Sequence, residues 1–250
     1  MKLYLVGGTI RDKLLDKPFN NDIDFAVEAP SYDIMKSSLI STLGLKIWQE
    51  REAFTSLRGH IPLEALPGRL QEWLPPPAPH DPTRAQINAD FTLCRKDGFY
   101  SDSRHPDTVE PTDIYDDLSR RDFTINAIAV DEVGVMLDPF NGQTDLTRRL
   151  LQTVGHPGER FTEDPLRLLR ALRFCVTHRL KIADHTNAYM LDQDLVDKLE
   201  HVSTERIQTE LHKAFVADTM RVIELLYYYH RIARKCFTDK LWVKPTMEAR

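Results

Sequence analysis

The sequence has few cysteines and no long apolar run, and each absence excludes a class of protein. Cys94, Cys175 and Cys236 are odd in number and far apart, so we expect free thiols rather than a disulfide framework or a cysteine-based metal cluster. No apolar stretch approaches the ~18 residues of a membrane-spanning helix, and the apolar start Met1–Val6 is too short for a signal peptide. We therefore expect a cytoplasmic protein with no membrane partner.

An excess of positive charge is also missing. The formal net charge of −5 argues against a protein that coats nucleic acid through bulk electrostatics, but it leaves room for a local basic surface. Residues 219–250 have such a bias, with seven Lys or Arg residues against three acidic ones. The 250 residues are 42% hydrophobic and 28% charged, which is typical of a globular protein of one or two domains.

An acidic strand is the main candidate for chemistry. Ile23, Phe25 and Val27 alternate with Asp22 and Asp24, which predicts a strand with one apolar face. Both carboxylates would then leave the other face, about 7 Å apart at their Cα atoms. Two Mg²⁺ ions roughly 4 Å apart can activate an attacking hydroxyl and stabilise a leaving oxygen in phosphoryl-type transfer. A solvated strand edge with two acidic residues is the alternative interpretation.

A strand, a diglycine and a helix precede this acidic strand. Residues 2–6 are predicted to form a short buried strand, and residues 9–15 have helical spacing directly after Gly7-Gly8. Glycines let the backbone come close to a ligand. Arg11, one turn into the helix, would reach a triphosphate oxygen. Gly8 and Arg11 are therefore candidate phosphate contacts, although diglycine turns are common without a ligand.

A helix, two strands and a proline-rich stretch follow. Ser31 is expected to cap a helix that ends at Gly44, and strands are expected over 45–48 and 54–61. The stretch 62–83 contains many prolines, which do not fit central strands. It is predicted to be an exposed loop or linker.

Further polar residues stand on or beside predicted strands. The strand expected over 87–95 includes Asp90, which would complete a metal site if its strand lies beside the first; a polar residue at a strand start is the alternative. The segment 99–111 has no periodicity and is predicted to be a mobile loop. Arg121 and Asp122 directly precede an apolar segment, which suggests polar groups held on a firm element, or else an ordinary surface ion pair.

A basic stripe lies on a later helix. Asp164 followed by Pro165 predicts a helix start, with the carboxylate as cap and the proline in the first turn. Arg167, Arg170 and Arg173 recur every third residue, beside an apolar stripe on the same helix. Such stripes are usually solvated faces. Here an acidic residue stands one turn before the first arginine, and that combination can recognise a base.

The stereochemistry of that combination is specific. A carboxylate accepts hydrogen bonds and a guanidinium only donates them, so Asp164 with Arg167 would match an edge that offers an amino donor beside a ring-nitrogen acceptor. Cytosine and adenine present that pattern, whereas uracil and guanine present the reverse. Leaving such groups unpaired costs about 1–3 kcal/mol each. These two residues would therefore select C and A over U and G without a nucleic-acid template.

Three consecutive tyrosines stand near the end of the helical region. A helix is expected over 222–232, and it includes Tyr227, Tyr228 and Tyr229. They could stack on RNA bases. Packing in a helical core is the preferred interpretation.

The motifs together resemble one family. Gly7-Gly8-Thr9-Ile10-Arg11-Asp12, Asp22-Ile23-Asp24 and Arg120-Arg121-Asp122-Phe123-Thr124-Ile125-Asn126-Ala127 occur in that order. They are followed by Asp138-Pro139-Phe140-Asn141-Gly142, Glu163-Asp164-Pro165-Leu166-Arg167 and Ser203-Thr204-Glu205-Arg206-Ile207. This succession resembles the bacterial-type (class II) CCA-adding tRNA nucleotidyltransferase and poly(A) polymerase family, within the DNA polymerase β superfamily.

The resemblance implies an architecture and site roles. It implies an α+β fold, with a nucleotidyltransferase head of mixed β-sheet and helices over 1–142, a helical neck over 143–215 and a short helical body over 216–250. Asp22 and Asp24 would bind Mg²⁺, with Asp90 as a third catalytic carboxylate. The implied nucleotide contacts are Gly8, Arg11, Arg121, Asp122 and Asn126 for sugar and phosphates, and Asp164, Arg167, Arg170 and Arg173 for the base.

The resemblance also implies a reaction. The expected activity is template-independent addition of C, C and A to a tRNA 3′ end from CTP and ATP. The segment 96–117 resembles the family's flexible element for switching from C to A, and 50–61 lacks the basic segment of bacterial poly(A) polymerases. A CC-only or A-only enzyme, a poly(A) polymerase, transfer to a non-tRNA acceptor and an inactive RNA-binding module are the alternatives.

Overall fold

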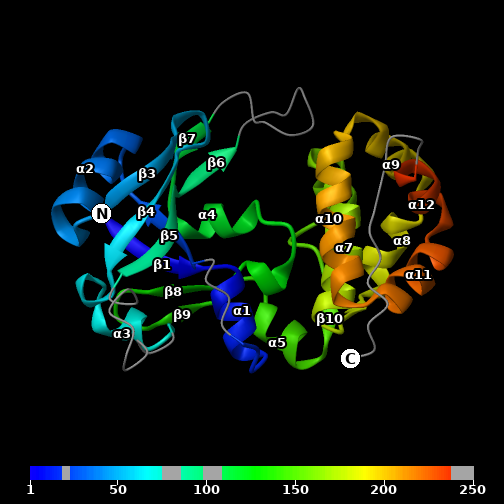
Figure 1. The fold of residues 1–250 in the computed structure, drawn as a ribbon, viewed down its shortest axis with the longest axis horizontal. Helices are drawn as coiled ribbons and strands as arrows, with labels where there is room; N and C mark the ends of the chain where they lie inside the picture. The colour runs from blue at the N-terminus through cyan, green and yellow to red at the C-terminus, as the bar shows by residue number, and fades with distance from the viewer. Residues whose placement is uncertain (19–22, 75–85, 98–108, 238–250) are drawn as a thin grey trace. The chain divides into compact units, whose positions relative to one another are not determined.

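The structure is a computed structural model that describes residues 1–18, 23–74, 86–97 and 109–237 (Figure 1). It consists of two compact units that divide between Leu146 and Thr147, here called the first and second unit. The first unit combines a sheet with helices, and the second is mainly helical. The predicted α+β class is therefore confirmed. No helix within the described ranges is long and apolar enough to cross a membrane.

A seven-stranded mixed sheet forms the centre of the first unit. Its strand order is β3-β4-β5-β2-β1-β8-β9. The β2/β5 pair is parallel, and every other neighbouring pair is antiparallel. The strands are β1 (Lys2–Val6), β2 (Ile23–Glu28), β3 (Lys46–Arg51), β4 (Ser56–Pro62), β5 (Gln86–Leu93), β8 (Ala129–Asp131) and β9 (Met136–Leu137).

Apolar alternation fixes which face of the sheet is buried. Leu57, Phe91, Phe25 and Leu5 are register partners across β4, β5, β2 and β1, and each side chain is at most 1% exposed. The rings of Phe25 and Phe91 stack with centroids 5.2 Å apart. Because the side-chain period of a strand is two, the residues that precede or follow these four must leave the opposite face. That rule places the polar residues of the candidate site.

Short helices surround this sheet. Helix α1 packs against β1 and β2, α2 against β4, and α4 against β2. Ser31 Oγ accepts from the Ile34 N–H at the start of α2, and Gly44 ends that helix with a φ of 64°, as expected. The helices are α1 (Gly8–Leu14), α2 (Tyr32–Leu43), α3 (Gly68–Gln71), α4 (Ile114–Ser119) and α5 (Gly142–Thr147).

Two predicted loops are partly regular structure. The stretch expected to be a loop over 62–83 contains α3, and Leu66, Leu70 and Leu74 are buried; residues 75–83 lie outside the described ranges. The segment 99–111 was expected to lack regular structure, but β7 (Val109–Pro111) pairs antiparallel with β6 (Arg95–Asp97). Residues 98–108 lie outside the described ranges. In both cases a few buried or paired residues impose structure that composition does not indicate.

The second unit consists of helices and one short parallel strand pair, β10 (Leu150–Leu151) with β11 (Lys181–Ile182). Helix α10 packs along α7, and α11 contacts both. The predicted single helix over 222–232 is two helices, which meet at Tyr229. The helices are α6 (Pro157–Glu163), α7 (Leu166–Thr177), α8 (Asp184–Met190), α9 (Gln193–Asp197), α10 (Thr204–Ala217), α11 (Thr219–Tyr228) and α12 (His230–Cys236).

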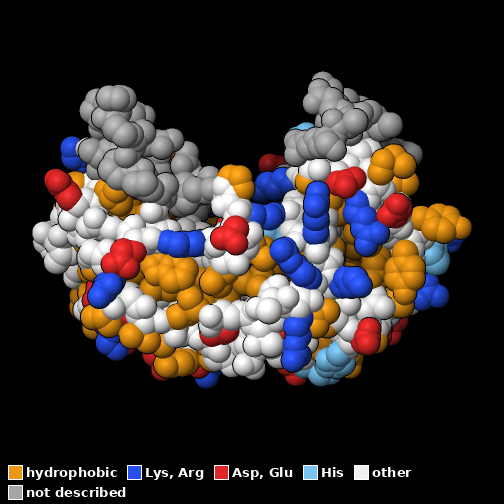
Figure 2. Space-filling model, turned by 90° about the horizontal axis from the view of Figure 1, so that it is seen from below, with side chains coloured by type: hydrophobic (Ala, Val, Ile, Leu, Met, Phe, Trp, Pro, Cys, Tyr) orange, Lys and Arg blue, Asp and Glu red, His pale blue; other side chains and the backbone are white. Residues whose placement is uncertain are grey.

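The tyrosines at this junction do not share one environment. Tyr229 is 5% exposed and its hydroxyl donates to Asn187 Oδ1 at 2.5 Å. Tyr227 and Tyr228 are 86% and 55% exposed. The preferred interpretation of core packing is therefore right for Tyr229 and wrong for the other two, because the buried side of α11 is formed by Thr219, Val222 and Leu226 and both rings lie off it. Figure 2 shows further hydrophobic side chains exposed on this unit.

All three cysteines are free and buried, as expected. Burial raises the pKa of Cys175 and of Cys236 to about 12, and it also raises the pKa of Cys94. These thiols are therefore protonated at neutral pH.

Candidate active site

The candidate site is built on the sheet face opposite the apolar row. Asp24 on β2 and Asp90 on β5 are register partners in adjacent parallel strands. Their side chains therefore leave the same face from strands about 4.8 Å apart. Both residues are partly exposed. The sequence prediction that Asp90 stands on a neighbouring strand is confirmed, whereas Asp22 lies outside the described residues.

An arginine continues this row. Arg58 on β4 is the register partner of Asp90. Its Nε and Nη2 both donate to Asp90 Oδ2, at 2.8 and 2.5 Å. The row of polar side chains across the sheet is therefore Arg58, Asp90 and Asp24, and on the next strand it ends at the buried Val6. Arg58 was not among the predicted site residues, because the register of β4 cannot be derived from composition.

A glycine turn lies directly beside Asp24. Gly7 follows Val6 with φ 74° and ψ −130°, a conformation that L side chains rarely adopt. A Cβ atom built on Gly7 would lie 3.4 Å from Asp24 Oδ2 and 3.6 Å from Arg121 Nη1. The missing side chain therefore leaves space between a carboxylate and a guanidinium. The prediction assigned Gly8 and not Gly7; in the structure Gly8 begins α1.

The predicted nucleotide contacts of the first unit share one hydrogen-bond network. Arg11, which is 8% exposed, donates from Nη1 to Asn126 Oδ1 at 2.6 Å and from Nε to Asp12 at 2.9 Å. Asn126 Nδ2 in turn donates to Asp122 Oδ1 at 2.9 Å. Because arginine only donates and a carboxylate only accepts, these partners fix the orientation of the Asn126 amide. The structure brings these predicted residues together.

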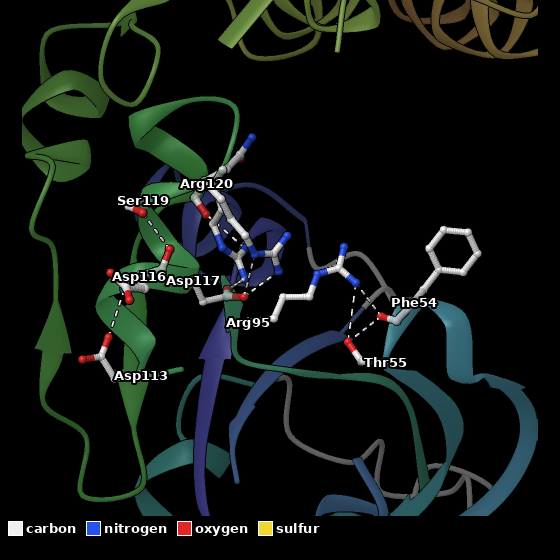
Figure 3. Close-up of polar contacts among 10 residues, drawn as sticks. Phe54, Thr55, Arg95, Asp113, Asp116, Asp117, Ser119 and Arg120 are labelled. Atoms are coloured by element: carbon white, nitrogen blue, oxygen red, sulfur yellow. Dashed lines mark hydrogen bonds and ion pairs between the residues drawn. The ribbon is translucent and has the colours of Figure 1, made fainter. Parts of the chain in front are cut away.

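Arg121 is held by a buried carboxylate. Asp117 in α4 is 1% exposed and accepts from Arg121 Nη2 at 3.0 Å and from Arg120 at 2.5 and 3.1 Å. Figure 3 shows Arg120 directed at Asp117. Burial alone would raise the pKa of Asp117, but the charges and hydrogen bonds of Arg120 and Arg121 outweigh it and lower that pKa below its usual value. Asp117 therefore remains a carboxylate that fixes Arg121.

The predicted base-recognition residues lie in the second unit, and each has a partner. Asp164 Oδ1 accepts from the Leu166 N–H at the start of α7, and its Oδ2 contacts Arg206 Nη2 at 2.8 Å. Arg167 Nη1 donates to Glu163 Oε2 at 2.7 Å. The predicted helix start is confirmed, but its N-cap is Pro165, and Asp164 stands one residue earlier. Sequence reasoning did not find Arg206 as a partner, because it comes from α10.

The two remaining arginines of the stripe face one buried acid. Arg173 Nε donates to Glu210 Oε2 at 2.5 Å, and Arg170 Nη1 lies 3.7 Å from Glu210 Oε1. Both guanidinium groups also lie over the Phe174 ring, at 5.5 Å for Arg170 and 4.2 Å for Arg173. Figure 2 shows Lys and Arg side chains gathered on this unit. Arg170 and Arg173 are thus anchored on Glu210 and on the Phe174 ring.

The donor atoms of the first unit fit a hard cation only in part. Within the described residues, no group of three or more His, Cys, Asp or Glu side chains is arranged to hold a metal ion. Two carboxylates, Asp24 and Asp90, do lie side by side, and oxygen ligands of this kind suit Mg²⁺. The predicted metal ligands are Asp22 and Asp24, with Asp90 as the third carboxylate, and Asp22 lies outside the described residues.

Comparison with known proteins decides the family. Residues 3–58 and 80–152 match the model of the Poly A polymerase head domain. The chain belongs to this family. The first matched segment runs from β1 to the start of β4, and the second includes Asp90, Asp117, Arg121 and Asn126.

Curated relatives of this head-domain protein extend the similarity. The Multifunctional CCA protein of Pseudoalteromonas atlantica is 32% identical over 245 residues, which cover 97% of this chain and 51% of the relative. The CCA-adding enzyme of Lactococcus lactis subsp. cremoris is 36% identical over 219 residues, covering 87% and 47%. The chain spans about half the length of the curated relatives it matches.

Solved structures show the same fold. The CCA-adding enzyme of Bacillus stearothermophilus in complex with CTP is 28% identical with a TM-score of 0.63, over 90% of this chain and 47% of that one. A tRNA nucleotidyltransferase complexed with a primer tRNA and an incoming ATP analog is 27% identical with a TM-score of 0.69, over 96% and 60%. The fold of this head-domain protein is thus that of tRNA-processing enzymes.

Proposed function

We propose that this protein is a nucleotidyltransferase that adds C, C and A in turn to the 3′ end of tRNA, using CTP and ATP. In each cycle the terminal ribose hydroxyl of the acceptor attacks the α-phosphorus of the triphosphate. A new oxygen–phosphorus bond forms, the bond between the α- and β-phosphates breaks, and pyrophosphate leaves. The similarity to CCA-adding enzymes supports the reaction and its substrates.

One observation supports this proposal most directly: Asp24 and Asp90 are register partners on one face of the sheet, with the Gly7 turn beside Asp24. An ordinary solvated strand edge would not place two carboxylates side by side next to a backbone turn whose positive φ favours glycine. The turn leaves space for phosphates near Arg121, which Asp117 holds in place. The arrangement suits transfer of a phosphoryl-type group.

Asp24 and Asp90, with the predicted ligand Asp22, are the residues that would hold Mg²⁺. When bound, two such ions would lower the pKa of the attacking hydroxyl and stabilise the leaving oxygen. The side chains of the protein hold the reactants in line: Arg121, Asp122 and Asn126 are proposed to contact the incoming nucleotide, with Gly8 and Arg11 at its phosphates. Positioning of this kind removes much of the entropic barrier to transfer.

Choice among nucleotides is assigned to the second unit. Asp164 and Arg167 are proposed to contact the base, supported by Arg170 and Arg173. Their present partners, Arg206 and Glu163, keep the carboxylate and the guanidinium in defined rotamers. On this proposal the head is residues 1–142, the neck 143–215 and the body 216–250.

The test is an incorporation assay. Purified protein is incubated with Mg²⁺, tRNA that lacks its 3′ CCA, and each labelled triphosphate alone and in combination. The proposal predicts that C is added first, that A is added only after C, and that growth stops at three nucleotides. Continued addition of A would indicate a poly(A) polymerase, and a stop after C would indicate a CC-only enzyme. Absence of addition to any tRNA would overturn the proposal.

A further inference from the structure

Arg58 stands in the row of catalytic carboxylates without an assigned role. Its side chain is 38% exposed, and that of its partner Asp90 is 25% exposed. Ion pairs with this degree of exposure contribute little to stability. Stabilisation of the fold is therefore a weak reason for an arginine at this position, and a contact with a substrate is a stronger one.

The geometry of the pair leaves part of the guanidinium available. Nε and Nη2, on one edge of the group, both donate to Asp90 Oδ2. Nη1 donates no hydrogen bond to any residue in the described ranges. A guanidinium is planar and has five N–H donors, so it can hold a carboxylate with one edge and a phosphate with another. Arg58 is thus fixed by Asp90 and still able to donate.

The strand order places Arg58 at one end of the row of polar side chains. Across the sheet the order is β4, β5, β2 and β1, so Arg58, Asp90, Asp24 and the Gly7 turn follow one another in a line. The proposed triphosphate contacts lie at the Gly7 end. Arg58 lies at the opposite end, beyond both carboxylates. In-line transfer places the attacking oxygen opposite the leaving pyrophosphate, so on this arrangement the ribose hydroxyl reaches the carboxylates from the side of β4.

We propose that Arg58 binds a phosphodiester of the acceptor RNA strand, next to its terminal ribose, while it holds Asp90 in position. This inference rests on the proposed function, because it takes the acceptor to be RNA. Nη1 donates to the phosphate, and Nε and Nη2 keep the Asp90 carboxylate beside the attacking hydroxyl. Arg58 thereby couples the placement of the acceptor to the orientation of a catalytic carboxylate.

The test is equilibrium binding of acceptor RNA, which needs no turnover. Fluorescently labelled tRNA lacking CCA is titrated with wild-type protein, Arg58→Gln, Arg58→Lys and the control Arg51→Gln, without triphosphate, from about 50 to about 200 mM salt. Arg51 is an exposed residue at the end of neighbouring strand β3, so its replacement removes the same charge away from the row.

The expected result is specific to a phosphate contact. Arg58→Gln weakens RNA binding about tenfold, since hydrogen bonds to charged groups contribute about 1.5–3 kcal/mol. It also lowers the magnitude of the slope of log K against log salt by about 0.7, the value for one single-stranded phosphate. Arg58→Lys keeps the charge and the slope and weakens binding less, about threefold. Arg51→Gln changes neither quantity, and all variants retain the thermal midpoint of the wild type.

Three outcomes would overturn the proposal. An unchanged salt slope in Arg58→Gln, with a loss seen only in turnover, would mean that Arg58 merely orients Asp90. The same conclusion follows if Arg58→Gln has no further effect on RNA binding in an Asp90→Asn background. Wild-type protein that does not bind RNA would also refute it. If wild-type protein binds RNA but adds no nucleotide, the proposed function fails while the Arg58 contact still stands on the binding data.

Discussion

The two units position their charged side chains in different ways. In the first unit, Asp24, Asp90 and Arg58 come from three strands that are distant in sequence, and the register of the sheet aligns them. In the second unit, Asp164 and Arg167 stand within one turn of a single helix start. Local spacing is therefore enough to create the second constellation, whereas the first exists only after the sheet has formed.

The difference has an energetic counterpart. In the first unit the carboxylates Asp24 and Asp90 are partly exposed, and the neighbouring Arg121 is held by the buried carboxylate of Asp117. In the second unit Arg167 pairs with the partly exposed Glu163, whereas Arg170 and Arg173 face the buried Glu210. We therefore expect a single substitution in the first unit to lower the rate of nucleotide incorporation strongly. A single substitution in the second unit should have a smaller effect, mainly on the preference among triphosphates.

The largest effect is expected for Asp24→Asn. Removing one of two neighbouring carboxylates should lower nucleotide incorporation by about a thousandfold, because the stabilisation of developing charge depends on it. The measurement is single-turnover incorporation of CTP. Glu28→Gln is the matched control, since Glu28 is on the same face of β2 at its other end and pairs with exposed Lys2. If Asp24→Asn lowers the incorporation rate by less than tenfold, the row of polar side chains on the sheet is not the catalytic site.

A smaller effect, on both stability and binding, is expected for Asp117→Asn. Breaking a buried pair costs about 3 kcal/mol in the free energy of unfolding at pH 7, and the released Arg121 should raise the KM for CTP about tenfold. Because the folded-state pKa of Asp117 is lowered, this stability is present above the unfolded-state pKa of about 3.9 and is lost as pH falls through the folded-state pKa.

The corresponding measurement is denaturant unfolding of wild type and Asp117→Asn as a function of pH. The difference in unfolding free energy should be constant near neutral pH and should shrink below about pH 4. Asp116→Asn is a control on the same helix, since Asp116 is half-buried and its carboxylate accepts from the Thr112 hydroxyl and from no arginine in the described residues. A difference that grows as the pH falls would contradict the assigned ionisation of Asp117.

The smallest effect on rate is expected for Asp164→Asn in the second unit. Replacing one acceptor oxygen by a donor should reduce the preference for C and A over U and G about tenfold, with less change in turnover of CTP. The measurement is the ratio of kcat/KM for the four triphosphates. Asp192→Asn, which alters a capping carboxylate of α9 in the same unit, is the control. An unchanged ratio would assign base choice to other residues.

The comparison also shows what sequence alone could predict. The alternation around Asp24, the diglycine and the helix start at Asp164 follow from local periodicity, and the structure has a strand, a turn and a helix there. The pairing of Asp90 with Arg58, of Asp164 with Arg206 and of Arg173 with Glu210 joins residues far apart in sequence. No periodic pattern reports such contacts, because they depend on register and helix packing.

Two errors have the same origin. The prolines of the stretch 62–83 led us to expect a loop. Leu66, Leu70 and Leu74 are buried instead, and Leu70 lies in the one-turn helix α3. Tyr227 and Tyr228 were expected in a core, yet they are exposed because the buried side of α11 is formed by Val222 and Leu226. In both cases one or two tertiary contacts decide the outcome against the average composition of the segment.

The buried cysteines give each unit its own reporter of opening. Thiol reagents attack the thiolate, and a buried, protonated sulfur offers neither access nor charge. Cys94 lies in the first unit, and Cys175 and Cys236 lie in the second. Alkylation of the native protein followed over time therefore measures how often each half transiently unfolds, without any label having been introduced.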